Sequence, residues 1–245
     1  SARELASLCD LVIVAVPVRA IPAVLSDIAG HLRPGTMVSD VGSVKTGIVE
    51  AARRVLPSHC HFVGGHPLAG SEQRGVEFAD PALFRDAYYV LTPTGDCDAE
   101  AYSRLHALIT SLGARVIAME PGLHDHAVSV ISHLPHVTAM GLMNIALLRA
   151  EKHPLLALAA GGFRDVTRIA ASDPALWLDI LMENRVAVGE SLGEFIDALR
   201  WVRELLREGR EEELLAWMER ASSGRRNLAP ALRESLAELF VLALP

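Results

Sequence analysis

Short runs of aliphatic and β-branched residues alternate with helical patterns through the first half of the chain. Leu11 to Val16 reads Leu-Val-Ile-Val-Ala-Val and stops at Pro17, which is typical of a strand buried on both faces. Four similar runs, bounded by Gly or Pro, predict further strands at 36–41, 61–63, 88–92 and 114–119. Apolar residues recur at helical spacing between them, at 21–32, 45–56 and 98–112. This alternation predicts an α/β protein with a parallel sheet.

After Pro121-Gly122 the strand signals stop, and the remaining pattern is that of long helices at 124–150 and 176–221. Pro135 is expected to kink the first of them. The second carries one continuous apolar stripe, made of Val188, Leu192, Phe195, Ile196, Leu199, Val202 and Leu206. Such a stripe packs either within its own domain or against a second subunit. We therefore predict a domain of residues 1–120, a helical domain of residues 121–221 and a tail of residues 222–245.

Composition and charge exclude several classes of protein. With 51% hydrophobic and 22% charged residues, the chain has the composition of a soluble globular protein. Its formal net charge of −7 makes a nucleic-acid partner unexpected. The three cysteines, Cys9, Cys60 and Cys97, have no metal-ligand spacing and indicate a reducing cytoplasm. The uninterrupted apolar stretches are shorter than the roughly 20 residues of a membrane span, so we expect no membrane segment.

The densest chemical signal is the segment Gly64-Gly65-His66-Pro67-Leu68-Ala69-Gly70-Ser71-Glu72. It follows a predicted strand and should lie at the carboxyl ends of the sheet, where open α/β folds bind their ligands. A lone histidine in a turn usually has no function. Here the flanking glycines, Ser71 and Glu72 favour a site, because imidazole can take up a proton near neutral pH.

A second loop, Asp40-Val41-Gly42-Ser43-Val44-Lys45, joins another predicted strand to a helix. Its backbone amides and Lys45 could hold an anion at the same edge of the sheet. The loop lacks the Gly-x-x-x-x-Gly-Lys pattern, and turns with Gly and Ser also occur for purely geometric reasons. Alone it is weak evidence for a binding site.

The helical half concentrates histidines in His124-Asp125 and in Ser132-His133-Leu134-Pro135-His136. They lack the spacing and third ligand of a zinc helix, so we predict no metal site and favour binding of a polar substrate. Further on, Arg168 follows Asp165 by three residues within Gly161 to Trp177. The two could form a surface ion pair, or Arg168 could present its guanidinium to a carboxylate.

Together with Ala15-Val16-Pro17, these segments occur in an order that resembles the prephenate dehydrogenase family, from about Leu8 to about Ala221. The resemblance implies a partial doubly wound, Rossmann-like parallel sheet followed by an all-helical dimerisation domain, and a homodimer formed through that domain. It also implies a small-molecule substrate and the cofactor NAD, with NADP as the other possibility. The expected reaction is oxidative decarboxylation of prephenate to 4-hydroxyphenylpyruvate in tyrosine biosynthesis.

The resemblance also assigns roles to individual residues. His66 is expected to take the proton from the ring hydroxyl, and Ser43 to hydrogen-bond His66 or that hydroxyl. Arg168 and His136 are expected to hold the carboxylate and the pyruvyl side chain. Four more residues are expected to line or gate the substrate pocket, namely Ser71, Glu72, His124 and Asp165. The residues expected at the cofactor are Val16, Pro17, Gly42, Ser43 and Lys45.

The family begins with a strand, a Gly-x-Gly-x-x-Gly turn, a helix and a second strand, and these 245 residues contain none of them. That segment binds the cofactor pyrophosphate and separates NAD from NADP. We expect the working protein to carry residues upstream of Ser1. Two alternatives remain: an arogenate dehydrogenase, whose substrate has an amino in place of the keto group, and a truncated dimeric fragment without dehydrogenase activity.

Overall fold

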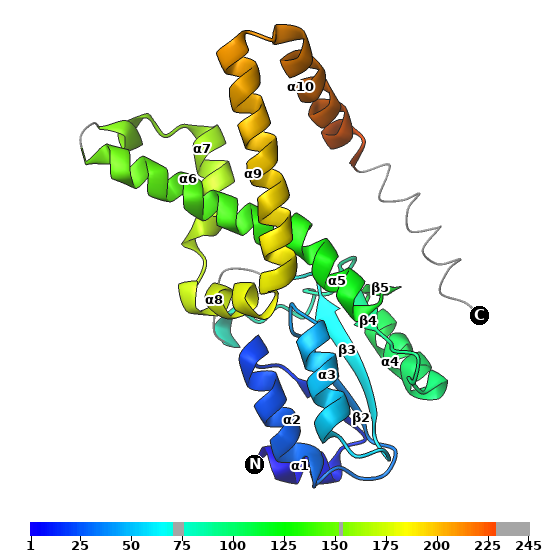
Figure 1. Cartoon of the computed structure of the whole chain (residues 1–245). Coiled ribbons are helices and arrows are strands. Elements are labelled where there is room, and N and C mark those ends of the chain that lie inside the picture. Colours follow the sequence, from blue (N-terminus) through cyan, green and yellow to red (C-terminus); the bar gives the residue numbers. More distant parts are fainter. Residues whose placement is uncertain (71–75, 152–153, 229–245) are drawn as a thin grey trace. The chain divides into compact units, whose positions relative to one another are not determined.

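The computed structural model of the chain describes residues 1–70, 76–151 and 154–228 (Figure 1). Internal contacts divide the chain into two compact units, 1–188 and 189–245. The first contains the sheet and all the candidate site residues that the structure describes. This division falls near Val188, and the domain boundary near residue 120 stays a prediction.

One sheet of five strands forms the centre of the first unit, in the order β1-β2-β3-β4-β5. The strands are β1 (Leu11–Val14), β2 (Met37–Asp40), β3 (His61–Pro67), β4 (Tyr88–Thr92) and β5 (Arg115–Ala118). The pairs β1/β2, β2/β3 and β4/β5 are parallel, as expected for the α/β fold class, which is confirmed. The pair β3/β4 is antiparallel, so the sheet is not parallel throughout.

The reason for the antiparallel pair lies in the length of β3 and in the connection that follows it. β3 continues past the predicted end at Val63 through Gly64 to Pro67, and β4 pairs with this second half, from Gly64 opposite Thr92 to Pro67 opposite Tyr89. A parallel return requires a crossover of a dozen or more residues, usually a helix. Among the described residues between the two strands, the helical element is the three-residue η2 (Val76–Phe78). His66 consequently lies in a strand rather than in a loop.

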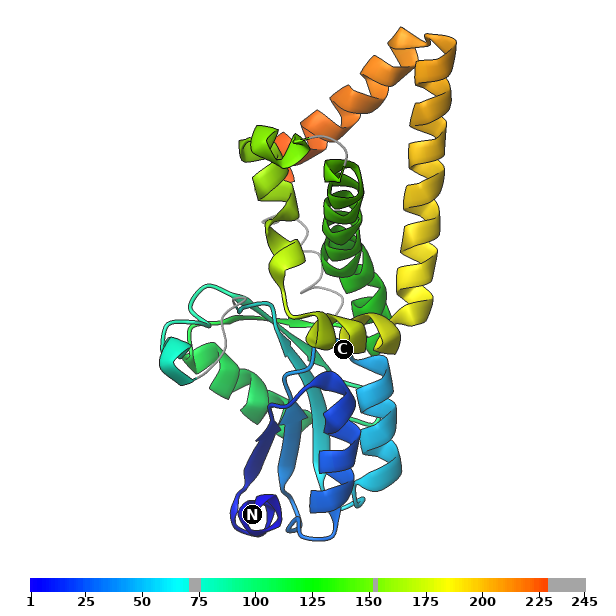
Figure 2. The same ribbon diagram turned by 90° about the vertical axis from the view of Figure 1, so that its left-hand side faces the viewer.

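Helices cover both faces of the sheet (Figure 2). On one face α2 (Ile21–Ala29) and α3 (Thr46–Val55) bury Ile21, Leu25 and Ile48 in a cluster with Val38 of β2. On the other face α4 (Ala99–Ser111) buries Leu105 and Ile109 against β3, β4 and β5. Each such fully buried side chain contributes about 1.5–3 kcal/mol. Two short elements complete this part, α1 (Ala2–Leu8) and η1 (Val18–Ala20).

The predicted helix 124–150 is three elements, α5 (Pro121–Val128), the π-helical turn η3 (Ser129–His133) and α6 (Leu134–Ala150). Pro135 has no backbone N–H to donate to the preceding turn, which accounts for the irregularity where a kink was expected. By length and composition Pro121–Ala150 is also long and apolar enough to cross a membrane. The sequence predicts no such segment, because its uninterrupted apolar stretches are shorter than a membrane span. Helices of soluble proteins pass the same test.

The predicted helix 176–221 is divided as well. It comprises α8 (Pro174–Glu183), α9 (Arg185–Glu208) and α10 (Glu211–Arg226), interrupted at Asn184 and at Gly209, whose φ is +67°. Asp173 caps α8, as the Asp-Pro pair predicts, by accepting from the amides of Ala175 and Leu176. Residues 222–226, placed in the tail by the sequence, belong to α10. Three short elements precede α8: η4 (Leu155–Leu158), α7 (Gly161–Thr167) and η5 (Arg168–Ala171).

Candidate functional site

The site begins where the second half of β3 passes the carboxyl end of β2. Gly65 lies so close to β2 that a Cβ atom there would be 2.6 Å from the carbonyl oxygen of Asp40. A glycine is therefore required next to His66, as the Gly-Gly pair in the sequence indicated. His66 follows immediately, half-buried and opposite Val90 of β4.

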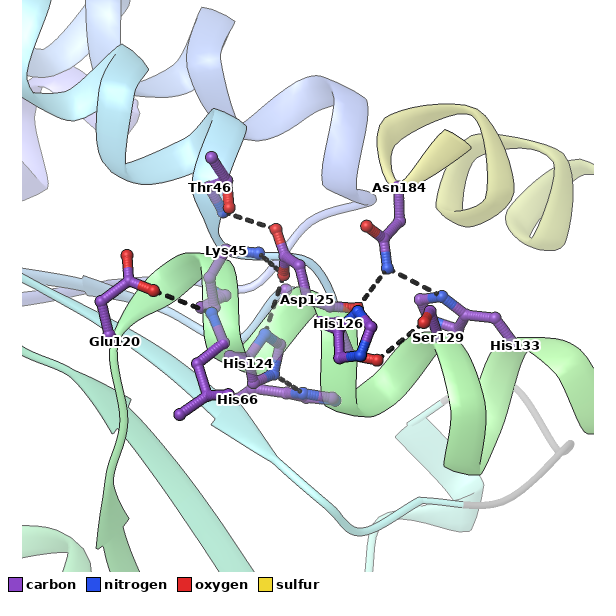
Figure 3. A network of polar contacts seen from close by, with 12 residues as sticks. Lys45, Thr46, His66, Glu120, His124, Asp125, His126, Ser129, His133 and Asn184 are labelled. Carbon is purple, nitrogen blue, oxygen red and sulfur yellow. Dashed lines mark hydrogen bonds and ion pairs between the residues drawn. The ribbon is translucent and has the colours of Figure 1, made fainter. Parts of the chain in front are cut away.

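A chain of hydrogen bonds runs from His66 into the protein (Figure 3). His66 Nδ1 lies 2.8 Å from His124 Nε2, and His124 Nδ1 lies 2.8 Å from Asp125 Oδ1. Asp125 also accepts from the backbone amides of Lys45 at 2.7 Å and Thr46 at 2.8 Å. The start of α3 thereby holds the carboxylate in place, and α5 presents His124 to His66.

The positions of the protons follow from this chain. Burial raises the pKa of Asp125, but hydrogen bonds from His124 and from Thr46 lower it more, and the pKa lies below its usual value. The ionised carboxylate can only accept, so His124 carries its proton on Nδ1. With Nδ1 of His124 donating to Asp125, Nε2 of His124 is the atom that accepts from Nδ1–H of His66. This leaves a lone pair on Nε2 of His66, which is the atom that a general base requires.

Several causes keep His66 neutral. Burial lowers its pKa well below the usual value, and the neighbouring His124, Lys45 and His133 lower it further, while Asp125 acts in the opposite direction. At pH 7 the imidazole is thus able to accept a proton.

Lys45 has a different position from the one expected. Its side chain is 0% exposed and forms an ion pair with Asp40, and Nζ donates to the carbonyl oxygen of Gly65 at 2.6 Å. Burial lowers the pKa of Lys45, and the carboxylate of Asp40 opposes that shift. We expected Lys45 to contact the cofactor. Instead its ammonium group bridges Asp40, at the end of β2, and Gly65 of β3, next to His66.

Two hollows meet at His66 and Ser43. The first, of about 800 Å³, has mainly apolar walls that include Val16, Pro17 and Gly42, three of the residues expected at the cofactor. The second, of about 700 Å³, includes His133, His136, Arg168 and Trp177. Both volumes are typical of small-molecule sites. His66 and Ser43 line both hollows, so a proton acceptor stands at their junction.

Aromatic packing orders the second hollow. The ring of His136 stacks on Trp177 with centroids 3.3 Å apart, and its Nε2 lies 3.2 Å from the hydroxyl of Ser172. Burial lowers the pKa of His136. Arg168 lines the same hollow, so the structure brings together four predicted residues from distant segments: His66, Ser43, His136 and Arg168.

The other predicted residues lie elsewhere. His124 is 1% exposed and stands behind His66 rather than in the walls of either hollow. Asp165 is exposed on α7 and also lies outside both walls. Ser71 and Glu72 lie outside the described residues. In the parts of the chain that the structure describes, no three His, Cys, Asp or Glu side chains gather as metal ligands would.

The sequence analysis assigned no individual role to His133, which it placed among histidines that favour a polar substrate, and none to Trp177 or Asn184. His133 was within a histidine-rich segment, which was a usable signal, whereas nothing local marks Asn184. Its amide nitrogen lies 2.7 Å from the carbonyl oxygen of Asp125 and 3.2 Å from Nδ1 of His133. Folding alone brings these three residues together.

Comparison with known proteins gives a consistent result. Residues 1–118 match the family model described as prephenate dehydrogenase, nucleotide-binding domain, and residues 120–220 match prephenate dehydrogenase, dimerization domain. Prephenate dehydrogenase from Bacillus subtilis is 38% identical over 89% of this chain and 59% of its own length. Cyclohexadienyl dehydrogenase from Zymomonas mobilis is 37% identical over 79% of this chain and 67% of its own length.

Solved structures show the same likeness. Prephenate dehydrogenase from Aquifex aeolicus, in complex with hydroxyphenyl propionate and NAD+, superposes with a TM-score of 0.85 at 32% identity, covering 93% of this chain and 80% of that one. Arogenate dehydrogenase from Synechocystis superposes with a TM-score of 0.82 at 30% identity, covering 93% of this chain and 82% of that one. The chain spans 59% of the Bacillus subtilis relative. Because the two domain models of the family match both halves of the chain, the chain belongs to the prephenate dehydrogenase family.

Proposed function

We propose that this chain carries the catalytic base and the substrate pocket of a dehydrogenase that converts prephenate to 4-hydroxyphenylpyruvate with NAD as oxidant. The observation that carries the proposal is the position of His66. His66 lines both hollows, and its Nδ1 is bonded through His124 to the buried carboxylate of Asp125, which leaves Nε2 as the acceptor.

The first hollow fits the nicotinamide end of a dinucleotide. Its mainly apolar walls suit a flat ring. Val16, Pro17, Gly42 and Ser43 would hold that ring. When bound, NAD supplies a two-electron acceptor for the hydride. The Aquifex relative, whose structure contains NAD+, supports this choice of cofactor.

The protein's own residues supply the rest of the chemistry. His66 Nε2 takes the proton of the ring hydroxyl, and Asp125 stabilises the resulting imidazolium through His124. Ser43, on the walls of both hollows, hydrogen-bonds the same hydroxyl. Arg168 and His136 hold the side-chain end of the substrate, where the guanidinium pairs with a carboxylate. Departure of the ring carboxylate as CO2 makes the ring aromatic, which favours the products.

Arogenate is the second candidate substrate. The Synechocystis arogenate dehydrogenase superposes nearly as well as the Aquifex enzyme, and the two substrates differ only in an amino or keto group on the side chain. That group would lie in the second hollow, near His136 and Arg168. Comparing kcat/KM for the two substrates decides between them.

We also propose a cytoplasmic homodimer formed through the helical residues 120–220. Supporting this, the matched family model is described as a dimerization domain, and α6 exposes large apolar side chains such as Ile145, 56% exposed, and Leu148, 67% exposed. A dimer interface would cover such a surface, which also accounts for the apolar character of Pro121–Ala150 without a membrane. Light scattering after gel filtration should give twice the chain mass of 26.4 kDa. A monomer at micromolar concentration would rule the dimer out.

The activity is tested by NADH formation at 340 nm with purified protein, prephenate and NAD, then with arogenate and NADP. His66→Ala is the control, because it removes the base and leaves both hollows open. The proposal is supported if the unchanged protein turns over substrate and His66→Ala does not. No turnover from a folded sample in any combination refutes dehydrogenase activity of these 245 residues and favours the non-catalytic fragment.

A further inference from the structure

His133 and Asn184 form a buried pair beside the second hollow. His133, on η3, is 1% exposed and lines that hollow, and Asn184, at the end of α8, is 5% exposed. Figure 3 shows the asparagine amide between Asp125 and His133. The ring of His133 also meets Trp177 edge-on at 6.0 Å, which restricts its rotation.

The pair determines which nitrogen of His133 carries its proton. The carbonyl oxygen of Asp125 can only accept, so the atom that faces it at 2.7 Å must be the NH2 nitrogen of Asn184. The same nitrogen lies 3.2 Å from His133 Nδ1 and donates to it. Burial lowers the pKa of His133 to about 4, so the ring is neutral at pH 7. Its single proton is therefore on Nε2.

His66 and His133, two of the three imidazoles that line the second hollow, thus have opposite tautomers. His66 has its proton on Nδ1 and an acceptor at Nε2, whereas His133 has an acceptor at Nδ1 and a donor at Nε2. The difference comes from their partners: His124 accepts from His66, and Asn184 donates to His133. An uncharged donor suits a carboxylate that must lose its charge, because a cation would stabilise the bound substrate more than the transition state.

We propose that His133 determines specificity by donating Nε2–H to a carboxylate oxygen of the substrate, and that Asn184 is the positioning residue that keeps the proton on that nitrogen. The inference rests on the proposed function, which supplies the carboxylates. It adds a residue to the substrate pocket that the family resemblance had not assigned.

The tautomer can be measured without any activity. Protein labelled with 15N-histidine gives separate nitrogen signals for protonated and unprotonated ring positions, and His133→Gln identifies the His133 signals by their loss. We expect the proton on Nε2 in the unchanged protein, and a shift toward Nδ1 in Asn184→Asp, whose carboxylate accepts from Nδ1. A proton on Nδ1 in the unchanged protein overturns the role of Asn184.

Donation to the substrate is measured by calorimetric titration with prephenate and with 4-hydroxyphenylpyruvate. His133→Leu should bind prephenate roughly 10- to 100-fold more weakly, the usual effect of losing a hydrogen bond to a charged group. His133→Gln, which keeps a donor at a similar reach, should restore most of the affinity, and thermal melting establishes that each variant is folded. Equal weakening for both ligands assigns the side-chain carboxylate, and weakening for prephenate alone assigns the ring carboxylate.

The matched control is His126, an exposed histidine on α5, for which His126→Leu should leave both affinities unchanged. The two titrations separate the donor role of His133 from the proposed function. If the unchanged protein does not bind prephenate, the proposed function is wrong. If it binds prephenate and His133→Leu binds equally well, only the donor role of His133 is refuted.

Discussion

Replacing Asp125 with asparagine tests the hydrogen-bond chain behind His66. The carboxylate accepts three bonds, from the amides of Lys45 and Thr46 and from Nδ1 of His124, all at 2.7–2.8 Å. Asparagine is nearly isosteric but has one acceptor oxygen, and its NH2 group must face one of the donors. In either orientation of the amide, one backbone N–H loses its partner.

The structure sets the expected size of the effects. One unpaired buried N–H costs about 1–3 kcal/mol, which lowers the melting temperature by about 2–12 °C in a unit of this size. The negative charge that stabilises protonated His66 is also lost. With the NH2 group facing His124, the imidazoles reverse their tautomers, so that Nε2 of His66 carries a proton and cannot act as a base. We expect kcat to fall by about 10²- to 10⁴-fold.

The assay combines steady-state NADH formation with thermal and urea unfolding of the same samples. Asp197→Asn on α9 is the matched control, since that carboxylate is 74% exposed and, within the described part of the chain, pairs with Arg200 on the surface of its own helix. It should change neither kcat nor stability measurably. If folded Asp125→Asn protein keeps kcat within about threefold of the unchanged protein, the chain of bonds from Asp125 to His66 has no part in catalysis.

Four further results are expected. His66→Ala should abolish turnover but leave prephenate affinity, measured by calorimetry, within a few-fold; retention of most of the activity would remove His66 from the mechanism. Arg168→Ala should raise KM with a smaller change in kcat, and an unchanged KM would contradict its role at the carboxylate. Lys45→Met leaves the Asp40 carboxylate buried and unpaired and should lower the free energy of unfolding by about 3–5 kcal/mol in urea titrations, whereas an equally stable variant would show that the ion pair is dispensable. The pKa of His133 is lowered from 6.5 to about 4, so acidification from pH 6.5 to pH 4 protonates this residue in the unfolded chain first and should cost roughly 3 kcal/mol of stability. That loss of stability should be absent above pH 6.5 and smaller in His133→Gln. An identical pH dependence of stability in the variant would refute the contribution of His133.

Local patterns in the sequence were sufficient for most elements of the fold. The runs that predicted β1, β2, β4 and β5 contain those strands, and the helical spacing at 21–32, 45–56 and 98–112 contains α2, α3 and α4. The buried side of each helix or strand sets the spacing of its apolar residues. This spacing can be read from a short stretch of consecutive residues. The order of motifs was equally informative, and the family comparisons confirmed the membership that it indicated.

Local sequence patterns predicted neither the direction of β4 nor the contacts of Lys45. Direction depends on how a strand returns to the sheet. The sequence predicts a parallel sheet, although it places no helix between the strands at 61–63 and 88–92. The Gly-Ser-x-Lys loop is compatible with anion binding as well as with a buried ion pair. The folded structure shows that the loop forms the ion pair, because the carboxylate of Asp40 and the carbonyl oxygen of Gly65 both contact the ammonium group of Lys45.

The sequence by itself thus determined the α/β and helical halves, the family and four residues that meet in the second hollow: His66, Ser43, His136 and Arg168. Tertiary structure alone decided which atoms of these residues are available for chemistry. The proton of His66 depends on Asp125, 59 residues away in sequence, and that of His133 depends on Asn184, 51 residues away. A tautomer is set by the partner across a hydrogen bond, and no spacing along the chain specifies which residue that partner will be.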